Sequence, residues 1–153
     1  MKELNIGLFG LGTVGSGIFT VLQRARNCHA RISRICVRSL SKPRAVEVPE
    51  NILTDNPADI LSDPDIDLVV EVIDNAEASL AIVTEAMRRG KSVVSGNKAM
   101  IARHLPELIE LQRQTGTALL YDASACGSIP VIRNLEEYYD NDLLLEVKGI
   151  LNG

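Results

Sequence analysis

Short apolar runs alternate with segments of helical spacing along the first 121 residues. An apolar run that ends in a turn is typical of a buried strand, and apolar residues that recur every three or four positions are typical of a helix packed on one face. The predicted strands cover residues 4–9, 30–37, 52–53, 68–73, 92–94 and 117–121, and the second of them is indicated by alternation of apolar and polar residues. Helices are predicted between them, at residues 14–26, 57–62, 76–89 and 106–114. Six strands that alternate with helices indicate an α/β fold, a doubly wound parallel sheet of the Rossmann type.

Two of these helices have particular sequence signals. The first has apolar residues at helical spacing that we expect to face the sheet, namely Val14, Ile18, Val21 and Leu22. The helix at 76–89 follows Asn75, whose side chain is predicted to cap its N-terminus.

The last thirty residues have a different pattern. Residues 122–130 are mostly small, and we expect them to form a loop at the carboxyl end of a strand. A helix is predicted at 131–138, and the alternation over 143–148, with Leu143, Leu145 and Val147 on one face, predicts a further strand. Because that strand would have no following partner, we expect the chain to be the first part of a longer protein.

Composition limits the class of protein. With 153 residues, of which 46% are apolar, the chain suits a single buried core. Its net charge of −4 and lack of a basic block argue against nucleic-acid binding. No apolar run approaches the roughly 18 residues that cross a membrane, and no signal peptide is recognisable. Three cysteines, Cys28, Cys36 and Cys126, lack the spacing of a disulfide framework or zinc site, which fits a reducing cytoplasm.

The first predicted strand leads into the glycine motif G-x-G-x-x-G, at Gly10, Gly12 and Gly15. Gly10 allows a tight turn, Gly12 has no side chain to hold a pyrophosphate away, and Gly15 lets the helix lie close to the strand. The helix N-terminus can then donate its free N–H groups to phosphate oxygens. The motif together with its strand and helix predicts a dinucleotide site.

The end of the second predicted strand bears on the choice of cofactor. A carboxylate there would bind a ribose 2′-hydroxyl, whereas a basic residue accommodates a 2′-phosphate. This chain has Arg38, followed by Lys42 and Arg44, and no acid before Glu47. The pattern favours NADP, with NAD remaining possible.

Ligands of open α/β sheets lie beyond the carboxyl ends of the strands. Lys98 is the lysine among the segments predicted to follow strands, and we expect it in a loop there. Its ammonium group suits orienting the nicotinamide carboxamide, holding a substrate oxygen or relaying a proton. Asp122 and the carbonyl groups after it form a hard-oxygen set, which suits an alkali or alkaline-earth cation.

Four motifs, in order along nearly the whole chain, resemble homoserine dehydrogenase. They occupy residues 7–15, 95–99, 121–132 and 149–153, and the last three are far more specific than the glycine loop. The resemblance implies contacts to the cofactor pyrophosphate from Gly10, Gly12, Thr13, Val14 and Gly15. It also implies that Arg38 faces the 2′-phosphate, and that Ser95 and Lys98 lie beside the nicotinamide, with Lys98 in the active centre.

The same resemblance implies a sodium ion bound by the loop residues Asp122, Ala125, Gly127 and Ile129. The family usually has glutamate at the position of Asp122, and commonly has two glycines where this chain has Asp74 and Asn75.

By this resemblance, the whole enzyme would interconvert L-homoserine and L-aspartate 4-semialdehyde by hydride transfer with NADPH or NADH, on the route to threonine, methionine and isoleucine. It would be a cytoplasmic homodimer. Residues 1–121 would be the NAD(P)-binding domain, and residues 122–153 the start of the dimerisation and catalytic region, so the chain alone would be nearly inactive. Two other interpretations are a free-standing NAD(P)-sensing module and another oxidoreductase acting on amino-acid aldehydes.

Overall fold

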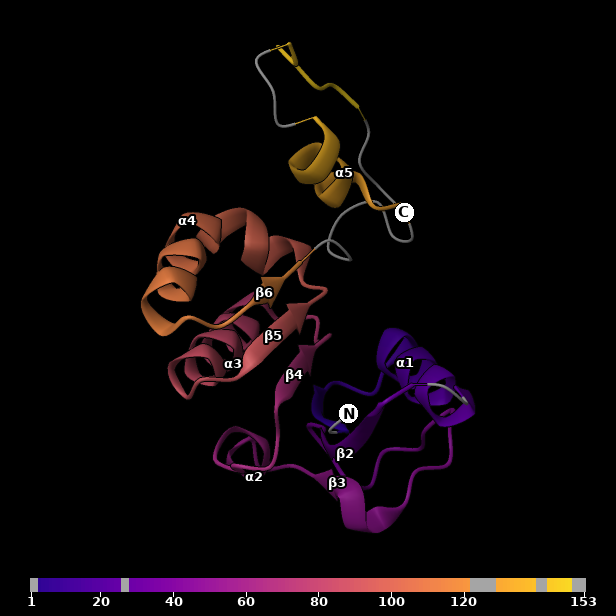
Figure 1. Cartoon of the computed structure of the whole chain (residues 1–153). Coiled ribbons are helices and arrows are strands. Elements are labelled where there is room, and N and C mark those ends of the chain that lie inside the picture. Colours follow the sequence, from indigo (N-terminus) through magenta and orange to yellow (C-terminus); the bar gives the residue numbers. More distant parts are fainter. Residues whose placement is uncertain (1–2, 26–27, 122–128, 140–142, 150–153) are drawn as a thin grey trace.

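A computed structural model describes residues 3–25, 28–121, 129–139 and 143–149 (Figure 1). Its centre is a six-stranded sheet in the order β3-β2-β1-β4-β5-β6, in which every neighbouring pair is parallel. The strands are β1 (Leu4–Phe9), β2 (Ala30–Cys36), β3 (Leu53–Thr54), β4 (Leu68–Glu71), β5 (Ser92–Ser95) and β6 (Leu119–Leu120). The predicted doubly wound parallel sheet is confirmed.

Helices cover both faces of this sheet. The helices on the faces are α1 (Thr13–Arg24), α2 (Ala58–Leu61), α3 (Ala76–Arg88) and α4 (Lys98–Thr115). The helix α5 (Val131–Tyr138) buries no residue, and a short 3-10 helix η1 (Glu50–Ile52) precedes β3. One buried cluster joins the sheet to α2, α3 and α4, and a second joins it to α1. Figure 1 shows α3 and α4 together, α1 apart from them, and α5 beyond the β6 edge. Adjacent residues of one strand, such as Val69 and Val70, belong to different clusters, which explains the continuous apolar runs.

The buried face of α1 differs in part from the prediction: Ile18 and Leu22 pack against the core as expected, but Val14 and Val21 do not. Val14 and Val21 are 61% and 66% exposed, whereas Gly15 and Phe19 are buried against the sheet. Gly15 faces the Gly10 turn at very close distance, so the adjacent Val14 lies on the outer side of the helix.

The predicted start of the helix at residues 106–114 is also wrong. α4 begins at Lys98 rather than at Pro106, which lies inside it. A proline inside a helix removes one backbone hydrogen bond, but here the turns before it are held by other contacts. The Asn97 side chain accepts a hydrogen bond from the Met100 N–H at 2.9 Å, and Met100 and Ile101 are buried.

Residues 143–149 do not form the predicted strand. A strand is held in a sheet by a neighbouring strand, and none of the described strands pairs with this segment. Leu143 and Leu145 are 90% and 92% exposed.

The short third strand is shifted as well, to Leu53–Thr54, because Ile52 belongs to η1. None of the described helices is both long and apolar enough to cross a membrane.

Candidate cofactor-binding edge

The carboxyl ends of the central strands form the candidate site. The chain runs from β1 to β2 on one side and later returns to β4 on the other side of β1. Open α/β sheets bind ligands at such a point, beyond the carboxyl ends of the strands. The loops after β1, β2, β4 and β5 therefore meet at one edge of the sheet.

The glycine loop has the close geometry that the motif predicts. Gly10 has a φ of +98°, a conformation that L side chains rarely adopt. A Cβ atom on Gly15 would lie 2.1 Å from the Gly10 carbonyl oxygen, so α1 packs against the turn at a distance that only glycine permits. A Cβ atom on Gly12 would meet no protein atom within 4 Å. The space beside Gly12 is therefore left open by the protein.

The N-terminus of α1 differs from those of α3 and α4. Asn75 and Asn97 cap α3 and α4 through their side chains, which accept backbone N–H groups at 2.8 and 2.9 Å. α1 begins at Thr13, after the N-cap residue Gly12, with no side-chain cap and no acidic residue in its first turn. Its first N–H groups have no partner within the helix, and Thr13 and Val14 beside them are exposed. This end of α1 is suited to an external anion.

Arg38 lies at the same edge, exposed, two residues after the end of β2. The Gly10 N–H donates to the Cys36 carbonyl oxygen at 3.0 Å, which ties the glycine loop to the end of β2. A second arginine, Arg44, organises the loop that follows. Its guanidinium donates to three carbonyl oxygens, those of Ser39 at 2.7 Å, Leu40 at 2.9 Å and Lys42 at 3.0 Å.

Cys36, the last residue of β2, is buried close to this edge. Burial, and to a lesser extent the charges of Asp55 and Asp59, raise the pKa of the Cys36 thiol to about 11. Cys36 therefore behaves as a small apolar core residue, and not as a nucleophile.

The structure places Ser95 and Lys98 close together in the chain but in different environments. Lys98 is exposed and is the first residue of α4, rather than part of a loop as the sequence predicted. Ser95 is fully buried. Its hydroxyl donates to a Glu71 carboxylate oxygen at 2.6 Å and accepts the Asn97 N–H at 3.2 Å.

Sequence reasoning did not identify Glu71. This residue ends β4 and is 0% exposed. The available signal was an acid in the apolar run Val69-Val70-Glu71-Val72, because a carboxylate is rarely buried without dedicated hydrogen-bond donors.

Most of the predicted cation loop lies outside the described residues, including Asp122, Ala125 and Gly127. Ile129 is described, is 61% exposed, and its carbonyl oxygen accepts the Val131 N–H at 2.8 Å. In the part of the chain that the structure describes, no three His, Cys, Asp or Glu side chains are grouped so as to hold a metal ion.

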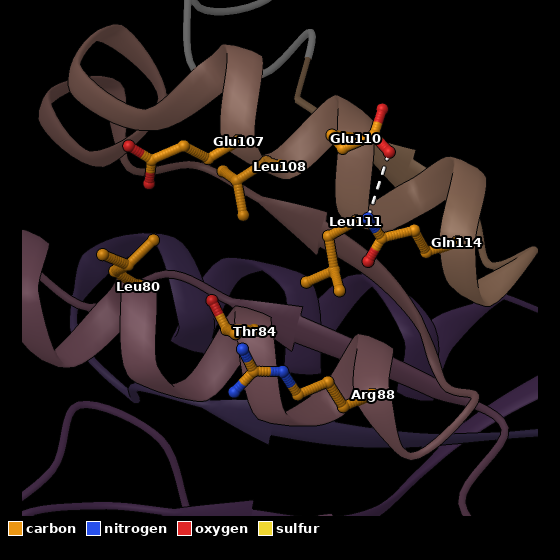
Figure 2. Close-up of a pocket in the computed structure, with 8 residues that line it drawn as sticks. All are labelled: Leu80, Thr84, Arg88, Glu107, Leu108, Glu110, Leu111 and Gln114. Atoms are coloured by element: carbon orange, nitrogen blue, oxygen red, sulfur yellow. Dashed lines mark hydrogen bonds between the residues drawn. The ribbon is translucent and has the colours of Figure 1, made fainter.

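A groove of about 350 Å³ lies between α3 and α4 (Figure 2). Leu80, Leu108 and Leu111 contribute apolar side chains to it, and Arg88 and Glu110 contribute charged ones. All its lining residues belong to the two helices, so it is separate from the strand ends.

Comparison with known proteins identifies the family. Residues 10–122 match the family model described as "Homoserine dehydrogenase, NAD binding domain". The homoserine dehydrogenase of Bacillus subtilis is 36% identical over an alignment of 160 positions, which covers 100% of this chain and 37% of that protein. The Synechocystis homoserine dehydrogenase is 38% identical over 155 residues, covering 98% and 36%. A crystal structure of the Thiobacillus denitrificans homoserine dehydrogenase superposes with a TM-score of 0.78 at 37% identity, covering 90% of this chain and 33% of that one.

The chain thus spans little more than a third of the length of the curated relatives it matches. The matched model is that of an NAD-binding domain, so the cofactor class is a nicotinamide dinucleotide. The chain belongs to the homoserine dehydrogenase family and contains that family's NAD-binding domain.

Proposed function

We propose that this chain binds NADP(H) across the carboxyl edge of its sheet, with the pyrophosphate over the first turn of α1. The observation that carries this proposal is the uncapped start of α1 at the point where the strand order reverses. The contacts would come from the glycine loop and the first helical turn, through Gly10, Gly12, Thr13, Val14 and Gly15. The open space beside Gly12 fits a phosphate group, because no protein atom fills it.

The preference for NADP rests on Arg38. Arg38 is exposed two residues after β2, and the last residue of β2, Cys36, is hydrogen-bonded to Gly10 of the glycine loop. A guanidinium matches the geometry of a phosphate dianion and gains a charge-assisted hydrogen bond that a ribose hydroxyl does not offer. No acidic residue occurs between Arg38 and Glu47 to repel the 2′-phosphate.

The reaction we assign to the longer protein is interconversion of L-homoserine and L-aspartate 4-semialdehyde. The bound nicotinamide would supply or accept the hydride. Lys98, exposed at the start of α4, would hold the carbonyl oxygen of the aldehyde and stabilise its developing negative charge. Because the chain spans about a third of its relatives, it would carry the cofactor half of this reaction and turn over little substrate alone.

Several finer assignments are part of the proposal. Asp122, Ala125, Gly127 and Ile129 would hold a sodium ion through oxygen ligands, the donor type that alkali cations accept.

A homodimer is supported by exposed apolar side chains near the C-terminus, such as Tyr138 at 70% and Leu145 at 92% exposure. Cys28 and Cys36 are free thiols, which supports a reducing, cytoplasmic location. We place the boundary between the cofactor domain and the following region at residues 121 and 122.

The proposal is tested by titrating NADPH and NADH into the wild-type chain and into Arg38→Ala. We expect the wild type to bind NADPH more tightly than NADH, and Arg38→Ala to lose about tenfold in NADPH affinity with little change for NADH. Arg113→Ala is the matched control. Arg113 is also an exposed arginine, but it lies in the last turn of α4, where its guanidinium is 3.7 Å from the Glu110 carboxylate. Equal losses for the two cofactors would exclude Arg38 as the phosphate contact, and a wild type that binds neither would refute the function.

A further inference from the structure

Glu71 is a fully buried carboxylate at the cofactor edge. It ends β4, where it lies between Phe9 of β1 and Ser95 of β5 in the sheet register. Burying a carboxylate is unfavourable unless its oxygens receive hydrogen bonds. The structure supplies three donors: Oε1 accepts the Ile73 N–H at 2.8 Å, and Oε2 accepts the hydroxyls of Ser79 and, at 2.6 Å, Ser95.

These donors come from separate elements that meet at the edge. Ile73 belongs to the loop between β4 and α3, Ser79 to the first turns of α3, and Ser95 to the end of β5. The Gly96 N–H adds a further link, because it donates to the Glu71 backbone carbonyl at 3.0 Å. One residue therefore fixes the exits of β4 and β5 relative to each other.

The network continues from Ser95 to the start of α4. The Ser95 hydroxyl accepts the Asn97 N–H at 3.2 Å, and the Asn97 side-chain amide donates to the Ile73 carbonyl at 3.1 Å. The same Asn97 side chain caps α4, whose first residue is Lys98. The position of Lys98 is thus set through Asn97 and Ser95 by the Glu71 carboxylate.

We propose that Glu71 is a positioning residue that holds the β5–α4 turn, and with it Lys98, in the place where the nicotinamide half of the cofactor binds. This inference rests on the proposed function. Glu71 itself touches no cofactor, because it is enclosed on all sides. The pyrophosphate and 2′-phosphate contacts lie on the β1 and β2 side of the edge, so Glu71 should affect the nicotinamide half selectively.

The test compares two ligands on the same chain. NADPH contains both halves of the cofactor, whereas 2′-phospho-ADP-ribose lacks the nicotinamide. Glu71→Gln keeps the side-chain volume but cannot accept at both oxygens. We expect it to weaken NADPH binding about tenfold and to leave 2′-phospho-ADP-ribose binding within about twofold of the wild type. The fluorescence of the reduced nicotinamide should show a more mobile, more hydrated ring in the variant complex.

Two further variants keep the proposal falsifiable. Ser95→Ala removes only the link to the β5–α4 turn, so it should show the same selective loss, and it decides the question if Glu71→Gln does not fold. Lys91→Met is the control, because Lys91 is also buried and donates to the Asp63 and Ile66 carbonyls at 2.5 and 2.8 Å at the opposite, amino edge of the sheet. It should lower stability without distinguishing the two ligands.

The outcomes separate the two hypotheses. A wild type that binds neither ligand refutes the proposed function, and the positioning role with it. A wild type that binds both, with a Glu71→Gln or Ser95→Ala variant that binds both unchanged or loses both equally, overturns the positioning role alone. A selective loss in Lys91→Met would also overturn it, because general destabilisation would then produce the same effect.

Discussion

Gly15→Ala should destabilise the fold although alanine is the better helix former. The added Cβ atom would lie 2.1 Å from the Gly10 carbonyl oxygen and 2.9 Å from its carbon, and real Cβ contacts are essentially never below 3.0 Å. The atom it meets belongs to the backbone, so no side-chain rotation relieves the overlap. α1 must move away from the turn by close to an ångström, and overpacking of this kind typically costs about 1–3 kcal/mol.

Gly17→Ala is the matched control on the same helix. A Cβ atom on Gly17 would meet nothing within 4 Å, so the substitution should gain the helix propensity of alanine, about 0.5–1 kcal/mol. Urea unfolding followed by circular dichroism measures both variants, and the two free energies of unfolding should differ by about 1.5–4 kcal/mol, the loss in Gly15→Ala added to the gain in Gly17→Ala. If Gly15→Ala proved as stable as Gly17→Ala, the close approach of α1 to the glycine turn would be refuted.

Two other predictions concern the same edge of the sheet. Gly12→Ala should leave the unfolding midpoint unchanged, because its Cβ atom meets no protein atom, yet it should weaken NADPH binding at least about tenfold in a calorimetric titration; unchanged affinity would exclude the open space beside Gly12 as the phosphate site. Cys36, with its pKa raised to about 11, should hold about one thiolate in a thousand at pH 8 and resist alkylation in the native chain, whereas exposed Cys28 should react. The labelling of Cys36, followed by peptide mass spectrometry, should rise about tenfold per pH unit up to about pH 10. Equal labelling of Cys36 and Cys28 at pH 8 would contradict the burial of Cys36.

The alternation of strands and helices could be predicted because most strands are short segments rich in apolar residues and bounded by turns, whereas the helices repeat their apolar residues every three or four positions. Prediction failed where a local signal was outweighed by packing. Pro106 looked like a helix start, but the Asn97 cap and the burial of Met100 and Ile101 extend α4 backwards past it. Residues 143–147 alternate like a strand, but alternation cannot supply the backbone partner that a strand requires.

Only those parts of the candidate site that depend on neighbouring residues in the chain could be predicted. The glycine turn is encoded locally, since the conformation of Gly10 and the contact of Gly15 depend on residues within one short segment. The network around Glu71 is not local: its donors lie 2, 8 and 24 positions away. Ser95 is buried because it belongs to that network, whereas Lys98 is exposed. The different roles of Ser95 and Lys98 therefore could not be predicted from the Ser95–Lys98 motif alone.

The order of the strands has a consequence for synthesis of the chain on the ribosome. The half-sheet β3-β2-β1 is complete once residue 54 has emerged, but β1 lacks its other neighbour until β4 follows, because Ile6 pairs with Leu68. The edge of β1 is therefore open during an interval of translation, a state in which nascent chains are prone to wrong pairing. The carboxyl edge on both sides of β1 is complete only when β4 has paired with it, so a bound dinucleotide can stabilise the finished sheet but cannot guide its first half.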